Sequence, residues 1–219
     1  MSLTKGCTHM VRRTKEEAQE TRSQILDAAE QAFYEHGVGR TTLAKIAEVA
    51  GVTRGAIYWH FSNKSDLFEA MFERAHLPFE ELAKASESAS EPDPLGRMRE
   101  LLVQVFKQTA SDAQVRRINE ILFHKCEYTD ELNDLRQRMQ DNSIDCDQRI
   151  ELTLRNAINK GQLPEDLNTK RAALCLHSFI DGVLAKWLLA PKSFALGKEA
   201  ERMVDVVLDM LRLSPGLRE

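Results

Sequence analysis

Apolar residues recur every three or four positions over most of this 219-residue chain, which is the spacing of one face of an α-helix. Runs of β-branched residues and clusters of turn residues are few, so the pattern favours an all-α fold. The expected helices cover residues 14–36, 42–50, 54–60, 62–77, 94–106, 115–126, 130–160, 169–188 and 199–213.

The segment Thr41–Lys64 reads as two short helices joined by a tight turn. Thr41 or Thr42 is placed to cap the first helix, and Gly51 supplies the left-handed backbone that ends it. Thr53 is placed to cap the second helix. Val52 and Ile57 flank that cap with the spacing of a hydrophobic staple, which fixes the angle at which the chain enters the helix. The segment therefore predicts a helix-turn-helix, whose second helix enters the major groove of DNA.

Helical periodicity places five residues of the second helix on its outward face: Thr53, Arg54, Gly55, Tyr58 and Trp59. An arginine at this position is able to grip guanine through two hydrogen bonds. The alternative interpretation is an ordinary helical hairpin. The helix-turn-helix is favoured because Gly51 and the staple point to it independently.

Prolines, glycines and polar runs divide the chain. The expected divisions are a basic N-terminal arm or non-native remnant at 1–13, a helix-turn-helix domain at 14–61, a connecting helix at 62–77 that Pro78 stops or kinks, and a ligand-binding and dimerisation domain at 78–219. The segment SESASEPDP (86–94) is the clearest linker. The arm has two interpretations, which are a DNA-contacting extension and a frayed, solvated terminus.

Composition is that of an ordinary soluble globular protein, with 42% hydrophobic and 29% charged residues. Nine of the 30 Lys/Arg and seven of the 34 Asp/Glu lie in residues 1–64, a net charge of +2, whereas the remaining 21 and 27 give −6. This small bias suits a protein that contacts phosphate at one end only.

The four cysteines (7, 126, 146 and 175) show no spacing typical of a metal site or a disulfide framework, which favours reduced thiols in a cytoplasm. No metal or cofactor is expected. No apolar run approaches 20 residues and the start lacks a secretory signal, so we expect no membrane span. The pair His177–Asp181, with Cys146 or Cys175 as a nucleophile, is the one catalytic alternative. Since neither an oxyanion-type loop nor a cofactor motif accompanies it, we expect no enzyme.

The chain resembles the TetR family of one-component transcriptional repressors. The resemblance is most specific from Gly51-Val52 through Tyr58-Trp59-His60-Phe61 to Asn63-Lys64, followed by Leu67-Phe68, and extends more weakly over the whole chain. Within the family it is similar to the branch that controls multidrug efflux pump operons. The segments that carry this closer similarity are Arg117–Leu122, His124–Glu127, Asp181-Gly182, Trp187–Leu189 and Leu208–Pro215.

The resemblance implies roles at the DNA end, residue by residue. Arg54 matches a base-reading position, and small residues at Gly55 and Ala56 let the helix approach base edges. Trp59 and Phe61 are expected to pack and hold the recognition helix on its support. The implied DNA-binding residues are Thr42, Thr53, Arg54, Gly55, Ala56, Tyr58, Trp59, His60 and Lys64.

The resemblance further implies a homodimer joined through the last two helices, about 169–188 and 199–213, with two heads on a palindromic operator. The wide apolar faces of these helices agree with this, although burial within one chain would also explain them. A small hydrophobic or aromatic effector, such as an antibiotic or flavonoid, is the implied release signal. The implied pocket residues are Met98, Leu101, Leu102, Val105, Asn119, Phe123, Cys146, Ile150, His177, Ile180 and Asp181.

Three of these pocket positions, Asn119, His177 and Asp181, are polar residues on otherwise apolar helix faces. A mainly apolar cavity with a few polar groups suits a flat aromatic ligand, whereas satisfied core hydrogen bonds are the structural alternative. His177, Phe123 and Ala185 depart from the residues expected in this branch, which are an aromatic, a histidine and an arginine. The effector range is therefore expected to differ.

These features together predict a ligand-responsive repressor of a multidrug efflux operon. The alternatives are a regulator of an unrelated metabolic operon and a ligand-independent DNA-binding protein. A nucleoid-type binder without a ligand would need more positive charge than the net −4 of this chain.

Overall fold

The structure is a computed structural model that describes residues 5–127 and 133–219, with side chains from residue 15 onward. The described part is all-α, as predicted. Its helices are α1 Lys5–His36, α2 Leu43–Ala50, α3 Arg54–His60, α4 Lys64–Glu87, α5 Pro94–Ser111, α6 Ala113–His124, α7 Asn133–Asn159, α8 Thr169–Leu189 and α9 Leu196–Leu213, followed by the short 3-10 turn η2 Pro215–Leu217.

The helix-turn-helix forms through the local signals that its sequence carries. The Thr42 side chain accepts from the Lys45 amide at 3.1 Å, and the Thr53 side chain accepts from the Ala56 amide at 3.2 Å. Gly51 ends α2 in the left-handed region with φ 67°. Of the two candidate caps for α2, Thr42 is therefore the cap. Thr41 is buried instead, and its hydroxyl donates to the carbonyl oxygen of Gly37 at 2.7 Å.

The predicted start of the first helix and the predicted end of the connecting helix are wrong. α1 begins at Lys5 rather than near residue 14, so the predicted arm is helical over residues 5–13, while residues 1–4 lie outside the described part. α4 runs through Pro78 to Glu87, because Ala75 and Phe79 on either side of the proline are buried and packing carries the helix on. The connecting helix therefore reaches deep into the body.

The remaining helices follow the predicted pattern closely. Asp93 caps α5 and Asn168 caps α8 through side-chain oxygens that accept backbone amides of the first turn. Gly161, with φ 70°, follows the end of α7. The first residues of the predicted helix 130–160 lie outside the described part. α9 begins at Leu196, three residues before the predicted start.

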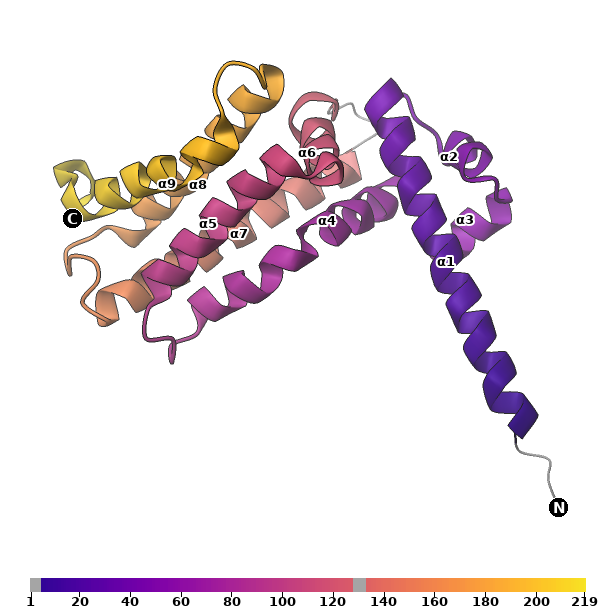
Figure 1. The fold of residues 1–219 in the computed structure, drawn as a ribbon, viewed down its shortest axis with the longest axis horizontal. Helices are drawn as coiled ribbons and strands as arrows, with labels where there is room; N and C mark the ends of the chain where they lie inside the picture. Colours follow the sequence, from indigo (N-terminus) through magenta and orange to yellow (C-terminus); the bar gives the residue numbers. More distant parts are fainter. Residues whose placement is uncertain (1–4, 128–132) are drawn as a thin grey trace.

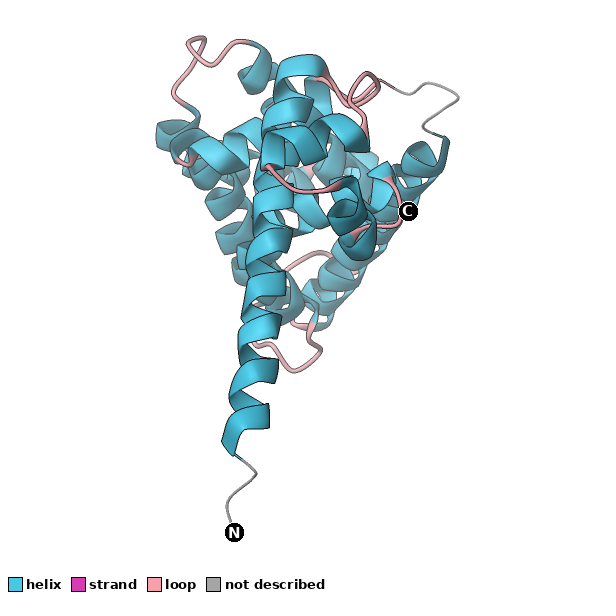
Figure 2. Ribbon diagram, turned by 90° about the vertical axis from the view of Figure 1, so that its right-hand side faces the viewer, coloured by secondary structure: helices cyan, strands magenta, loops and turns pink. Residues whose placement is uncertain are grey.

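The helices form an elongated body with the helix-turn-helix head at one end (Figure 1). α4, α5 and α7 run along the body, α8 and α9 lie at the end remote from the head, and α6 lies between the body and α1. The N-terminal half of α1 projects away from the other helices (Figure 2).

Two hydrophobic clusters hold the molecule together. The head cluster joins α1–α4, but it also contains Ile118 and Ile121 from α6 and Leu135 from α7, all at most 1% exposed. The body cluster draws on α5 and α7–α9, and Leu217 after α9 completes it. The head is therefore not an independent unit, because α6 supplies part of its core.

Among the described helices, α8 is long and apolar enough by composition to cross a membrane. Its apolar residues have another explanation in this fold. Leu176, Ile180, Leu184 and Leu188 are all buried in the body cluster, so α8 is a core helix.

Candidate nucleic-acid interface and effector-binding region

The N-terminal end of α3 presents an uncovered polar and aromatic surface. Thr53, Arg54 and Gly55 are exposed, and Ala56 is partly exposed. A methyl group added at Gly55 would meet only the Thr53 hydroxyl oxygen at 3.8 Å, so nothing inside the chain requires glycine there. Small residues at these two positions leave the first turn of α3 open to close approach by a partner.

The aromatic residues of α3 separate into surface and core. Tyr58 is 58% exposed and Trp59 is 73% exposed, whereas Phe61, just after the helix, is buried. The prediction that Phe61 packs is confirmed. The prediction that Trp59 packs is wrong, because most of its side chain is exposed; its indole forms a T-shaped pair with the neighbouring His60 ring, with centroids 4.5 Å apart.

His60 lies beside a basic group at the end of α3. Burial, and secondarily the Arg22 charge, lowers the pKa of His60 below its usual value. The Arg22 guanidinium lies 5.3 Å from the Phe61 ring centroid. At neutral pH the imidazole is therefore uncharged, and its contact with DNA would be a hydrogen bond rather than an ion pair.

Lys64 has a structural role inside the chain that the sequence did not predict. Its ammonium donates to three carbonyl oxygens: Val38 at 2.9 Å, Thr41 at 3.0 Å and Gly39 at 3.1 Å. An ammonium group has three protons, so these acceptors use its full donor capacity. In this structure the side chain therefore ties the start of α4 to the loop between α1 and α2. A phosphate contact by Lys64 remains a prediction.

Most of the predicted effector-binding residues gather in and around the body cluster. Met98, Leu102 and Ile180 belong to it, and Val105, Phe123 and Ile150 pack against it while partly buried. Leu101 is also partly buried on α5. The structure therefore brings the apolar part of the predicted set together on α5–α8.

A polar cluster lies where α7 meets α8. His177 Nδ1 lies 2.7 Å from Asp147 Oδ1, and Nε2 lies 3.6 Å from Asp181 Oδ2. A hydrogen bond with Cys146, together with the two carboxylates, raises the pKa of His177 to about 9, against the opposing effect of burial. Burial raises the pKa of Asp181, although the charge of His177 opposes this. At neutral pH this cluster therefore holds an imidazolium between carboxylates.

Asn119 is a core residue with a partner inside the chain. Its side-chain amide donates to the Thr109 hydroxyl oxygen at 3.1 Å, and that hydroxyl donates to the Val105 carbonyl at 2.8 Å. The structural alternative of a satisfied core hydrogen bond therefore describes Asn119 as it stands here. A ligand contact at this position remains a prediction.

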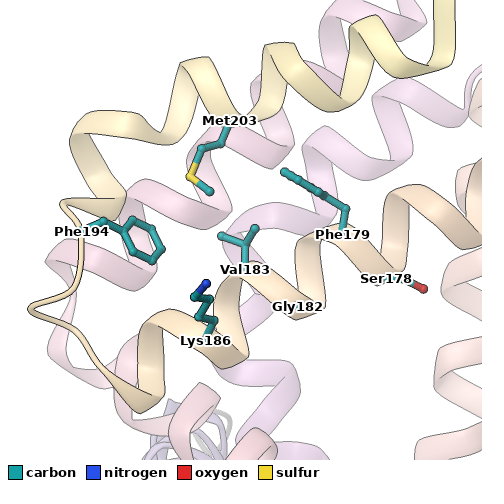
Figure 3. A pocket seen from close by; sticks show the side chains of 7 residues that line it. All are labelled: Ser178, Phe179, Gly182, Val183, Lys186, Phe194 and Met203. Carbon is teal, nitrogen blue, oxygen red and sulfur yellow. The ribbon is translucent and has the colours of Figure 1, made fainter. Parts of the chain in front are cut away.

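A groove of about 460 Å³ lies between α8 and α9. In Figure 3, Met203 of α9 and Phe194 of the preceding loop point towards Val183 of α8, and Lys186 reaches the groove from the same helix. The lining residues are Ser178, Phe179, Gly182, Val183, Lys186, Phe194 and Met203. None of them belongs to the predicted effector set, so this groove was missed by sequence reasoning.

Large apolar side chains are exposed on the same two helices. Leu174 and Leu189 of α8 and Val206 and Leu213 of α9 are all more than half exposed. Such a surface marks an interaction site more often than a solvated face. The periodicity of α8 and α9 signalled this surface, since each helix has more apolar positions than one core-facing stripe needs.

Comparison with known proteins shows which family this chain belongs to. Residues 25–71 match the bacterial regulatory proteins of the tetR family, and residues 93–213 match the C-terminal region of MAATS-type transcriptional repressors. The chain belongs to the TetR family. This membership was predicted from the sequence and is confirmed, and the family consists of transcriptional regulators rather than enzymes.

The TetR-family relatives extend over almost the whole chain. The chain is 57% identical to the HTH-type transcriptional regulator TtgR of Pseudomonas putida over 210 residues, which are 96% of this chain and all of that one. It is 44% identical to the regulator AcrR of Shigella flexneri over 95% of this chain and 97% of that one. The full lengths therefore correspond, head and body together.

Solved structures agree with this correspondence. NalD, the secondary repressor of the MexAB-OprM multidrug efflux pump in Pseudomonas aeruginosa, superposes with a TM-score of 0.80 at 32% identity, over 91% of this chain and all of that one. SmeT in complex with triclosan gives a TM-score of 0.80 at 35% identity, over 90% and 93% of the two chains. SmeT is the repressor of the SmeDEF multidrug efflux pump of Stenotrophomonas maltophilia.

Proposed function

We propose that this TetR-family protein is a ligand-responsive repressor of a multidrug efflux pump operon in the cytoplasm. The observation that carries the proposal is the combination of an uncovered α3 reading face with full-length similarity to TtgR. NalD and SmeT, both similar over about nine-tenths of the chain, repress efflux pumps.

The DNA-reading role falls on the first turn of α3. Arg54 is exposed, and its planar guanidinium suits the two acceptors of a guanine edge in the major groove. Tyr58, Trp59 and His60 are placed for groove or phosphate contacts along the rest of the helix. The hydroxyl oxygens of Thr42 and Thr53 each accept a hydrogen bond from a backbone amide at a helix start. Each hydroxyl can still donate its proton to a phosphate oxygen.

The homodimer forms through α8 and α9. The exposed apolar residues Leu174, Leu189, Val206 and Leu213 are the surface that a second copy covers. A methyl group added at Gly182 meets no atom within 4 Å in the chain, so a partner helix can pack closely there. Two copies related by a two-fold axis bring two heads to the half-sites of a palindrome.

The effector is a small hydrophobic or aromatic compound that binds among α5–α8. The apolar residues gathered there form its walls, and the cluster of His177, Asp181 and Cys146 supplies polar groups at one end. The complex of SmeT with triclosan supports an effector of this class. Binding shifts the protein towards a form whose heads no longer match the operator spacing.

Footprinting on the DNA upstream of the protein's own gene tests the proposal, with a protected palindrome as the expected result. Arg54→Ala should weaken operator binding by roughly 1–3 kcal/mol and relax the preference at one base pair. Arg54→Lys is the matched control, because it keeps the charge but loses the two-pronged contact. Equal losses on operator and random DNA for Arg54→Ala would refute the reading role.

Titration calorimetry with triclosan, with and without operator duplex, tests the release mechanism. Linkage is reciprocal, so a ligand that weakens operator binding must itself bind more weakly to the DNA complex. Triclosan affinity that is the same in both experiments would contradict its action as an inducer.

A further inference from the structure

Glu30 of α1 carries a carboxylate that is almost completely buried, with a side chain only 5% exposed. Its Oε1 lies 3.0 Å from Arg117 Nη1, and its Oε2 accepts from Gln114 Nε2 at 2.9 Å. Both partners belong to α6, more than 80 residues further along the chain. Arg74 of α4 approaches the same carboxylate at 3.8 Å. One buried charge therefore joins the head to two helices of the body.

Further contacts join the C-terminal end of α1 to α6. The Val38 amide, just after α1, donates to the Lys125 carbonyl at the end of α6 at 3.0 Å. The Arg117 guanidinium and the Lys125 ammonium lie 5.6 and 4.6 Å from the Tyr34 ring centroid. α6 thus holds the C-terminal half of α1 at several points along its length.

α6 also contacts α8, the helix that carries part of the proposed dimer surface. His124 Nε2 lies 3.0 Å from the Ala185 carbonyl oxygen of α8, and the Arg116 guanidinium lies 5.3 Å from the Trp187 ring centroid. α6 therefore lies between the head and α8, as Figure 1 shows.

A buried carboxylate cannot shift gradually away from its partners, because each lost partner leaves charge in a poorly solvated site. A rotation of the head on α6 would therefore break the Glu30 contacts rather than stretch them, which favours two discrete arrangements of the joint between head and body.

We propose that Glu30, held by Gln114 and Arg117, is a positioning residue that fixes the angle of the DNA-binding head on α6. It contacts neither DNA nor effector, and acts by keeping the two heads of the dimer at the spacing of the operator half-sites. The inference rests on the proposed function as a dimeric repressor, and it names the contact that regulates it.

Two substitutions at exposed Gln114 test the proposal, because they should change operator affinity in opposite directions. Gln114→Lys places an ammonium beside Glu30 and should tighten binding to the full palindrome, whereas Gln114→Glu places a second carboxylate there and should weaken it. We expect changes of about 2- to 30-fold in each direction. Affinity for a duplex that carries a single half-site should stay unchanged, since one head can bind whatever its spacing from the other.

Helix stability alone predicts the reverse order. Gln114 lies in the first turn of α6, where a negative side chain stabilises the helix dipole and a positive one does not. Exposed Ala113, in the same turn, is the matched control position. Ala113→Lys and Ala113→Glu report the effect of charge on α6, and neither should change the ratio of full-site to half-site affinity.

Hydrogen exchange at the Val38 amide gives a second measurement that needs no DNA. Exchange should be slower than wild type in Gln114→Lys and faster in Gln114→Glu. Equal or reversed effects of the two variants, in exchange or in the affinity ratio, would overturn the positioning role of Glu30. If the wild-type protein binds no palindromic duplex, the proposed function fails, and the Val38 exchange rates then decide the role of Glu30 alone.

Discussion

The head cluster is completed by side chains of the body, whereas the body cluster closes within residues 95–217 and leaves apolar side chains uncovered on its outer face. Most of the head cluster comes from α1–α4, but α6 and α7 contribute Ile118, Ile121 and Leu135 to it. The body has more apolar surface than it can bury. A head that borrows part of its core must respond to movement of α6, and a body with surplus apolar surface must find a partner. The proposed regulation and the proposed dimer both rest on this difference.

The largest effect on stability is expected at Ile118, which α6 contributes to the head cluster. Ile118 of α6 is fully buried in the head cluster, and Ile118→Ala should lower the free energy of unfolding by about 2–5 kcal/mol. Hydrogen exchange should then accelerate in α1 and α2, far from residue 118 in sequence. Leu176→Ala, at a fully buried position of the body cluster, should cost a similar amount in urea denaturation but leave exchange in α2 and α3 unchanged. Protection of the head that survives Ile118→Ala would show that its core closes without α6.

The second effect concerns the exposed apolar residues of α8 and α9 and is measured as a change in dimer stability. Val206→Glu puts a charge on the exposed face of α9 and should weaken the dimer by about 2–4 kcal/mol, as expected for a residue near the centre of an interface. Light scattering across a dilution series should detect monomers. Leu152→Glu, on the exposed surface of α7, is the matched control. A dimer that tolerates Val206→Glu would place the interface elsewhere.

The sequence predicted those parts of the fold that depend on neighbouring residues. The predicted caps Thr42 and Thr53 each accept from an amide three residues further on, so the local pattern is sufficient to find them. The same holds for Gly51, whose left-handed conformation ends α2.

The errors arose where distant contacts override a local signal. Pro78 is a helix breaker by itself, yet buried neighbours on both sides keep α4 continuous. Sequence spacing also gives no sign that the Lys64 ammonium donates to the carbonyl oxygens of Val38 and Thr41, because these partners lie more than 20 residues away. The partners of Glu30 lie 84 and 87 residues away, a separation at which periodicity carries no information about pairing.

The third effect is a loss of stability on substitution of Lys64, which distinguishes this residue from Arg54. Lys64→Met keeps the apolar stem but leaves the carbonyls of Val38, Gly39 and Thr41 without their charged donor, so stability should fall by about 1–3 kcal/mol. Arg54→Ala, at an exposed position, should change stability by less than about 0.5 kcal/mol while weakening operator binding. Thermal unfolding of both variants checks this. A fully stable Lys64→Met protein with poor DNA binding would support the predicted phosphate contact.

The smallest effect distinguishes head and body by the sign of their pH dependence. The pKa of His177 is raised to about 9 in the folded body, so its contribution to stability is complete below pH 6.5 and is lost as pH rises through 9. The destabilisation by His177→Gln should therefore be about 1–2 kcal/mol at pH 6 and close to zero at pH 9.5.

His60 in the head should behave in the opposite way, because burial and Arg22 lower its pKa in the folded state. Protonation of His60 then favours the unfolded chain, so His60→Gln should gain stability relative to wild type as pH falls below 6.5. Urea denaturation of both variants at pH 5, 6, 7.5 and 9.5 measures the two trends. If both variants follow the same trend, then either the cluster of Cys146, Asp147 and Asp181 does not hold a charged His177, or His60 is not shielded from protonation. A stability difference for His177→Gln that stays constant between pH 6.5 and 9 would contradict the charged His177. A difference for His60→Gln that stays constant below pH 6.5 would contradict the shielded His60.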